Sequence, residues 1–284
     1  MFTQEKYESI QKELNRLTAQ KIKVTRLVFY IYLLVLLLGL TIYLLSNQDD
    51  LLVILITGIL IGLGILGLVF SKFLISKQTM SDYLYHEIIE HINLDSGMFY
   101  KYSGKEKNTK EQIDKFYEGG LFPRAAVFVI NNMSGFNAEQ LKFECFNLKI
   151  ISSNGNTSTI HFDGIYYLME THLTTDLQLR TKGKPNVKGE KYQLINENEY
   201  MSVYKPETEN LNDVDENIIK KVKSYFTDET YKNVYLSVKN GHIHFALKYK
   251  HSLIDKINIK NIDQLNQLLV YINKSLELPN LFDE

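Results

Sequence analysis

The sequence predicts a membrane-anchored α+β protein. A two-helix transmembrane hairpin should precede a mixed, mainly antiparallel β roll or open barrel, with an inserted helix and a closing C-terminal helix. Two uncharged segments of 20 residues, Leu27–Ser46 and Leu51–Phe70, can each cross about 30 Å of hydrocarbon as a helix. Residues 121–284 then contain short runs rich in β-branched and aromatic residues, with two amphipathic helical stripes among them.

The two apolar segments should form an antiparallel hairpin, because only the four residues Asn47–Asp50 separate them. The outer flanks are basic, whereas this loop carries two aspartates and no base. Lys and Arg concentrate on the cytoplasmic side of short flanks, so we expect a cell-membrane protein with two spans and both termini cytoplasmic. The flanking bases are Lys21, Lys23, Arg26, Lys72 and Lys77. The alternative, a pair of core helices in a soluble protein, is disfavoured by 20 residues without a charge.

Glycines in the spans predict a close helix contact. Gly58 and Gly62 form a G-x-x-x-G pattern, and Gly39 in the first span is the nearest candidate to pack against it. Packing within the hairpin is favoured over self-association between protomers, which stays the alternative. Neither span contains an ionisable residue, so the hairpin is interpreted as an anchor and not as a transport pathway.

Four parts follow along the chain. Residues 1–26 are a cytoplasmic amphipathic helix, residues 27–70 the hairpin, residues 71–120 an amphipathic helix with a connector, and residues 121–284 a cytoplasmic α+β domain. Apolar residues recur every three or four positions in the first part and in residues 73–94, which predicts helices there.

The sequence of residues 121–284 predicts strands joined by tight turns. Asn154–Gly155 and Asn240–Gly241, each between apolar runs, predict hairpins. Helices are predicted at Val214–Phe226 and at Asn261–Leu278, where Pro279 ends the second. The predicted strands are Ala125–Asn131, Leu141–Ile151, Ser158–Thr171, Asp176–Thr181, Tyr200–Tyr204, Val234–Val238 and His242–Tyr249.

Several short motifs in this part resemble those of a bacterial family known as domain of unknown function 3137. They are the aromatic strand Phe162–Leu168, the G-G-L-F-P run Gly119–Pro123, the hairpin Val234–Ala246 and the closing Leu276–Leu278. The family often has an acidic G-x-D-x-x-x-G motif, and Asn131–Gly135 lacks the acid. The resemblance implies two amino-terminal spans, and it lends no catalytic residue because the activity of that family is unknown.

Few residues suggest a catalytic or metal-binding role. His242 and His244 alternate on a predicted strand, so both rings should share one face, and with His161 or a carboxylate they could begin a metal site. The preferred interpretation makes them solvent-facing hairpin residues without a metal. Cys145, the only cysteine, lies in an apolar run and is expected to be a buried small hydrophobe. No nucleotide-binding or hydrolase motif is present in the sequence, and no cofactor is predicted.

A lysine-rich loop is the remaining surface candidate. Residues 182–191 hold four lysines, two glycines and a proline, and could contact anionic lipid, although a solvated hairpin tip is favoured. These lysines are Lys182, Lys184, Lys188 and Lys191. The net charge of −1 argues against nucleic-acid binding.

Together these patterns favour a membrane-anchored cytoplasmic binding or scaffold module that contacts a lipid or protein partner, with homo-oligomerisation through the transmembrane helices as a further expectation. The sequence leans away from an enzyme. A membrane-tethered hydrolase or metalloenzyme, using a site around His242 and His244, is the alternative.

Overall fold

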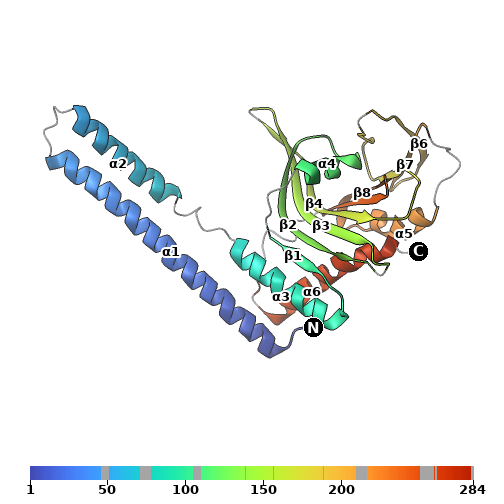
Figure 1. Cartoon of the computed structure of the whole chain (residues 1–284), viewed down its shortest axis with the longest axis horizontal. Helices are drawn as coiled ribbons and strands as arrows, with labels where there is room; N and C mark the ends of the chain where they lie inside the picture. The colour runs from blue at the N-terminus through green and yellow to red at the C-terminus, as the bar shows by residue number, and fades with distance from the viewer. Residues whose placement is uncertain are drawn as a thin grey trace. The chain divides into compact units, whose positions relative to one another are not determined.

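The computed structural model divides into two compact units, Met1–Leu84 and Tyr85–Glu284 (Figure 1). The described residues are 1–45, 51–70, 78–104, 110–137, 139–155, 157–187, 189–208, 216–249, 259 and 261–282. The predicted loop between the spans, the flanking bases Lys72 and Lys77, and Lys188 lie outside them.

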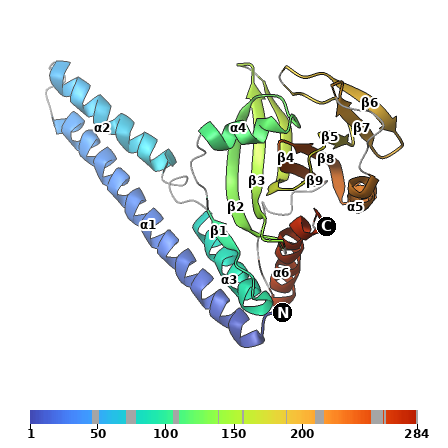
Figure 2. The same ribbon diagram turned by 45° about the vertical axis from the view of Figure 1, so that its right-hand side comes forward.

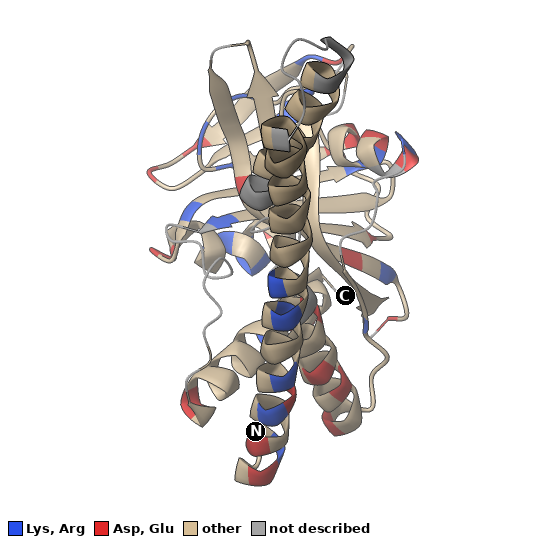
Figure 3. Cartoon of the chain, turned by 90° about the vertical axis from the view of Figure 1, so that its left-hand side faces the viewer, with Lys and Arg blue, Asp and Glu red and all other residues tan. Residues whose placement is uncertain are grey.

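The first unit contains two antiparallel helices, α1 (Gln4–Leu45, 42 residues) and α2 (Leu51–Phe70, 20 residues), which run side by side (Figures 1 and 2). Thr3 caps α1, because its Oγ1 accepts a hydrogen bond from Lys6 N at 3.2 Å. The predicted amphipathic segment and the predicted first span are therefore one unbroken helix. Its charged residues all lie between Glu5 and Arg26, towards the N-terminus (Figure 3).

Two glycines allow α1 and α2 to approach each other closely. A Cβ added to Gly39 would lie 3.0 Å from Leu60 Cβ, and one added to Gly64 would lie 2.8 Å from Leu36 Cβ. Both glycines are buried. Any larger residue at either position would push the helices apart, so small residues define this interface.

Gly58 and Gly62, which the sequence predicts as packing residues, lie outside the contact between α1 and α2. A Cβ at either position would meet nothing within 4 Å. Gly64 follows Gly62 by two residues, about 200° around the helix, so the contact uses a different face of α2. The predicted role of Gly39 agrees with its position.

By length and composition, one helix among the described residues could cross a membrane, Gln4–Leu44. Ile54–Ile65 is apolar but shorter within the part of α2 whose side chains are described. The structure thus supports one candidate span near the N-terminus, where the sequence predicts two. Of the apolar window in the longer helix, only 6% is buried inside the protein.

The second unit begins within α3 (Gln78–Ser96), which leads to β1 (Lys101–Ser103) and α4 (Lys110–Glu118). The helix α3 agrees with the helix predicted in residues 73–94, whereas α4 lies in the predicted connector. Tyr85 of α3 stacks on Tyr102 of β1, with ring centroids 5.2 Å apart. This contact helps to hold the helix on the first strand.

Nine strands form one open sheet in the order β1-β2-β3-β4-β9-β8-β5-β7-β6. Every described strand pair is antiparallel, so the sheet is not mixed as predicted. The remaining strands are β2 (Ala126–Phe136), β3 (Lys142–Ser153), β4 (Ser158–Glu170), β5 (Leu177–Arg180), β6 (Tyr192–Glu197), β7 (Ser202–Pro206), β8 (Tyr231–Lys239) and β9 (His242–Tyr249).

The predicted turns and helices of this unit are confirmed. Asn240 and Gly241 have φ of 50° and 73° and connect β8 to β9, as a tight hairpin turn requires. The inserted helix is α5 (Glu216–Thr227). The closing helix is α6 (Ile262–Glu277), and a 3₁₀ turn, η1 (Leu278–Phe282), follows it.

Strands β4 and β9 meet at the centre of the sheet, although 78 residues separate Tyr166 from its neighbour His244. Gly164 is needed at this junction, because a Cβ there would lie 2.2 Å from Leu247 O. A buried core cluster gathers around α4 and the strands behind it. Its members are Phe116, Leu121, Phe122, Val129, Phe146, Leu148, Ile150, Phe162, Tyr166, Leu168, Tyr235 and Ala246.

Candidate functional site

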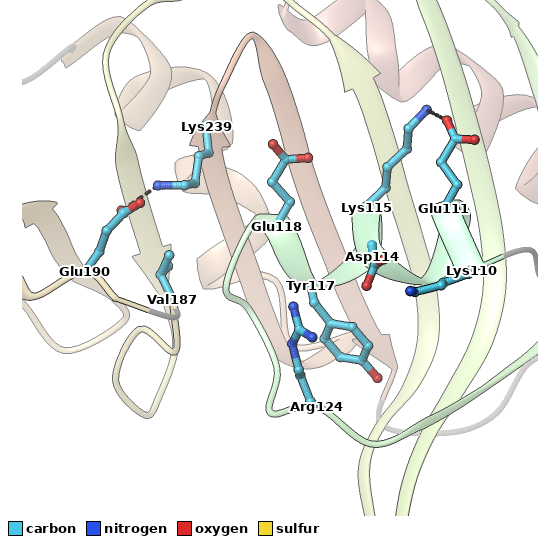
Figure 4. Close-up of a pocket in the computed structure, with 10 residues that line it drawn as sticks. All are labelled: Lys110, Glu111, Asp114, Lys115, Tyr117, Glu118, Arg124, Val187, Glu190 and Lys239. Atoms are coloured by element: carbon cyan, nitrogen blue, oxygen red, sulfur yellow. Dashed lines mark hydrogen bonds and ion pairs between the residues drawn. The ribbon is translucent and has the colours of Figure 1, made fainter.

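An open hollow of about 760 Å³ lies beside α4 (Figure 4). Its lining combines one face of α4 with residues from the β5–β6 connection and the end of β8. The lining residues are Lys110, Glu111, Asp114, Lys115, Tyr117, Glu118, Arg124, Val187, Glu190 and Lys239. Four of these are basic and four acidic, so the hollow is suited to a ligand that carries charge.

Some of these charges already have partners in the protein. Lys115 lies 3.7 Å from Glu111, and Lys239 contacts both Glu190 (2.5 Å) and Asp176 (3.3 Å). Lys239 is buried, and these hydrogen bonds and charges raise its pKa although burial opposes them. The charges of Lys115 and Lys239 are therefore balanced by carboxylates of the protein itself.

Other charges in the hollow have no ion-pair partner in the part of the chain that the structure describes. Within the described parts of the chain, no ion pair involves Lys110, Asp114 or Arg124. The Arg124 guanidinium lies over the Tyr117 ring, 5.9 Å from its centroid, and Tyr117 Oη donates a 2.6 Å hydrogen bond to Ala125 O. Figure 4 shows the guanidinium beside this ring. The hollow therefore presents a positioned cation–aromatic pair.

Buried polar side chains of β5 hold the segment that connects α4 to β2. Gln178 Nε2 donates to Gly119 O at 2.8 Å. Arg180 Nη2 donates to Leu121 O at 2.8 Å, and Arg180 Nη1 donates to Gln178 Oε1 at 3.0 Å and to Gly120 O at 3.4 Å. These bonds satisfy three consecutive carbonyl groups between α4 and β2 and fix their path.

Arg180 is a buried cation, only 5% exposed. Its guanidinium lies 5.1 Å from the centre of the Tyr235 ring, and burial lowers its pKa. Backbone carbonyls and an aromatic face take the place of a carboxylate among its described neighbours. Sequence reasoning missed this residue, because a single arginine in a four-residue strand carries no local signal.

Tyr166 and His244 form a buried pair that contacts the backbone of α4. Tyr166 Oη lies 2.8 Å from His244 Nδ1 and 3.2 Å from Phe116 O. The one hydroxyl hydrogen can serve only one acceptor, so the assignment that satisfies all three groups has Nδ1–H donating to Tyr166, which donates to Phe116. His244 Nε2 then has no hydrogen-bond partner among the described residues.

The environment keeps His244 neutral. Burial, and to a smaller extent the neighbouring His242 and Lys239, lower its pKa to about 3. The chain also packs directly on the ring, since a Cβ on Gly119 would lie 2.5 Å from His244 Cγ. Glycine is therefore required where α4 ends.

Three of the motifs that carry the family resemblance meet here. Phe122, from the G-G-L-F-P run, lies 4.7 Å from Phe162 and 5.3 Å from Tyr235 between ring centroids. Gly119 of the same run contacts His244 of the Asn-Gly hairpin. Residues far apart in sequence thus pack together behind α4.

The structure corrects the interpretation of the histidines as solvent-facing. His244 is fully buried, whereas His242 is half-buried and its Nδ1 lies 3.1 Å from Asn240 O. Their rings are 6.4 Å apart. The third candidate, His161, is hydrogen-bonded elsewhere: its Nε2 lies 2.8 Å from Ser152 Oγ. Within the described residues, no group of three or more His, Cys, Asp or Glu side chains could hold a metal ion.

Cys145 is buried, as its apolar neighbours predict. Burial raises the pKa of its thiol to about 12, although a hydrogen bond with Tyr167 opposes this. A thiol with a raised pKa is a poor nucleophile at neutral pH.

The lysine-rich loop is not a plain hairpin tip. Asn186 N donates a 2.9 Å hydrogen bond to Gly120 O, and a Cβ on Gly120, whose φ is 62°, would lie 2.2 Å from Val187 Cγ2. The loop is therefore packed against the segment that follows α4. Of its predicted lipid-contacting lysines, Lys182, Lys184 and Lys191 are exposed.

Comparisons with known proteins give one distant likeness. No family model and no curated protein matches the chain. The crystal structure of the mycobacterial trehalose monomycolate transport factor A, TtfA, is similar over 68% of this chain and 94% of its own. The identity is 9% and the TM-score 0.33, so this likeness carries no argument about function.

Proposed function

We propose that this protein is a membrane-anchored binding module. The proposal that α1 is a membrane anchor rests on its exposed apolar surface. Leu27, Leu34 and Leu44 are 61%, 66% and 74% exposed. Surface of this kind is unstable in water and is matched by lipid. The helix α2, with Leu55 60% exposed, would complete a two-span hairpin with both termini in the cytoplasm.

Binding is favoured over catalysis by the state of the reactive side chains. His244 is engaged by Tyr166 and covered by Gly119, and the Cys145 thiol is buried. A hydrolase or metalloenzyme built on His242 and His244 would need His244 to reach a substrate. The accessible charged groups lie instead in the hollow beside α4.

The proposed ligand of the hollow is a charged segment of a protein partner. Lys110 and Arg124 offer cations, Asp114 offers a carboxylate, and the Arg124–Tyr117 pair has the composition of an interface anchor. Exposed lysines of the neighbouring loop would add attraction to anionic lipid, about 1 kcal/mol for each lysine near the surface. Gly58 and Gly62, which face open space, would be available to a second copy.

Topology can be tested by cysteine labelling in intact cells. An impermeant thiol reagent should modify Ser46→Cys or Asn47→Cys from outside, because we expect that loop to be extracytoplasmic. Lys184→Cys should stay unmodified until the cells are opened. The natural Cys145 is buried and gives little background. Labelling of Lys184→Cys alone from outside would contradict the orientation.

The hollow can be tested by site-specific photocrosslinking in native membranes. A photoreactive residue at the exposed Glu111 should give an adduct, and Arg124→Glu should reduce its yield about tenfold, because it reverses an anchor charge. Lys223→Glu, on the exposed side of α5, is the matched control and should leave the adduct unchanged. An adduct insensitive to Arg124→Glu would show that the hollow does not hold the partner.

A further inference from the structure

A second groove, of about 750 Å³, lies between the end of α5, the start of β8, and α6 with η1. Four tyrosines line it, and leucines contribute apolar surface. These tyrosines are Tyr167, Tyr225, Tyr231 and Tyr271. Concave sites that combine apolar walls with a few fixed polar groups are typical of small-ligand binding.

Two of the rings form a fixed aromatic surface. Tyr225 and Tyr231 lie with centroids 6.0 Å apart and planes inclined by 35°. The ring of Phe245 meets Tyr225 edge-on at 5.5 Å, which holds Tyr225 in place. Both tyrosines are half-buried, so part of each ring remains accessible. The face of an aromatic ring carries negative charge density and attracts cations.

A carboxylate is fixed beside these rings. Asp228 Oδ1 accepts a 2.8 Å hydrogen bond from Thr230 N, and Asp228 O accepts one from Tyr231 N at 3.2 Å. One turn therefore positions both the carboxylate and the second ring. Burial, followed by the charge of Asp228, raises the pKa of Tyr225, so this carboxylate is close enough to act on the ring.

The other charged groups of the groove do not outweigh the negative charge of Asp228. Among the lining residues, Glu277 adds a second carboxylate and Lys274 the single ammonium group. The lining is therefore net negative. An anionic ligand would meet this potential and the negative ring faces, whereas a cation would meet attraction from both.

We propose that this groove binds an organic cation, an ammonium group on an apolar body. The cation would lie over the faces of Tyr225 and Tyr231 with Asp228 as its counter-charge, and the body would contact the leucines. This site is separate from the hollow beside α4 and does not depend on the function proposed for that hollow.

The test uses the full chain in lipid nanodiscs free of choline headgroups. Choline and its uncharged isostere 3,3-dimethyl-1-butanol have the same shape and differ in charge. Titration followed by ligand-observed NMR should show saturable binding of choline, at least about tenfold tighter than the isostere, as expected for a cation–aromatic contact with a counter-charge.

Variants distinguish ring, charge and shape. Tyr231→Leu and Asp228→Asn should each weaken choline binding about tenfold, whereas Tyr231→Phe should retain it because the ring remains. Tyr200→Leu, at a 46% exposed tyrosine outside the groove, is the control and should bind as the natural protein does. Equal binding of the two probes, no saturable choline binding, or an unchanged Tyr231→Leu variant would each overturn the proposal.

Discussion

Replacing Gly164 with alanine is expected to lower the free energy of unfolding of the second unit by about 3 kcal/mol. The added Cβ would lie 2.2 Å from Leu247 O and 3.1 Å from Lys248 Cα, both backbone atoms of β9. Backbone in the centre of a sheet cannot rotate away as a side chain can. The strands β4 and β9 must then separate where they join the two halves of the sheet.

The buried thiol of Cys145 provides the measurement. It lies on β3, opposite Tyr167 of β4, and can react with a thiol reagent only when this region opens. A loss of about 3 kcal/mol corresponds to labelling roughly 100-fold faster. Thr159→Ala, at an exposed position of the same strand, should leave the rate within about twofold. An unchanged rate in Gly164→Ala would show that the junction tolerates the methyl group.

Acidification from pH 7 to pH 5 is expected to destabilise the same unit by about 2 kcal/mol through His244 alone. The pKa of His244 is lowered to about 3 in the folded protein, against about 6.5 for an unperturbed histidine. Between these values the unfolded chain binds a proton that the folded chain does not. This stability is therefore present above pH 6.5 and is lost progressively as the pH falls towards 3.

The contribution of His244 can be isolated by comparing pH slopes. His244→Gln should reduce stability at pH 7, because it disturbs the contact with Tyr166, and should flatten the dependence between pH 7 and pH 5. His242→Gln removes a histidine from the same strand and is the matched control, which should keep the slope. A slope that survives in His244→Gln would assign the acid sensitivity to other groups.

Local elements of this fold are predictable from the sequence, because their signals lie within a few residues. The Asn240–Gly241 hairpin and the helices α5 and α6 all follow from turn residues or apolar stripes. The order of strands does not follow. The strand β9 pairs with β4, for example with Phe245 opposite Tyr167. No short stretch of sequence indicates which two strands will pair over such a distance along the chain.

The same distinction applies to the candidate site. The G-G-L-F-P run and the aromatic strand can be recognised as motifs in the sequence. Their contacts with His244 depend on the order of strands in the sheet. Alternation predicts which residues share a face of a strand, not whether both faces are covered. This is why His244 was expected in solvent and lies in the core.

The unbroken course of α1 makes its polar half a lever arm. Once the apolar half lies in a bilayer, the helix from Gln4 to Arg26 extends about 34 Å beyond it. A helix without a hinge passes any tilt directly to its amino-terminal end, so a 20° inclination displaces that end by about 12 Å. A change in the tilt of this span would thereby be converted into a sideways movement at the amino terminus.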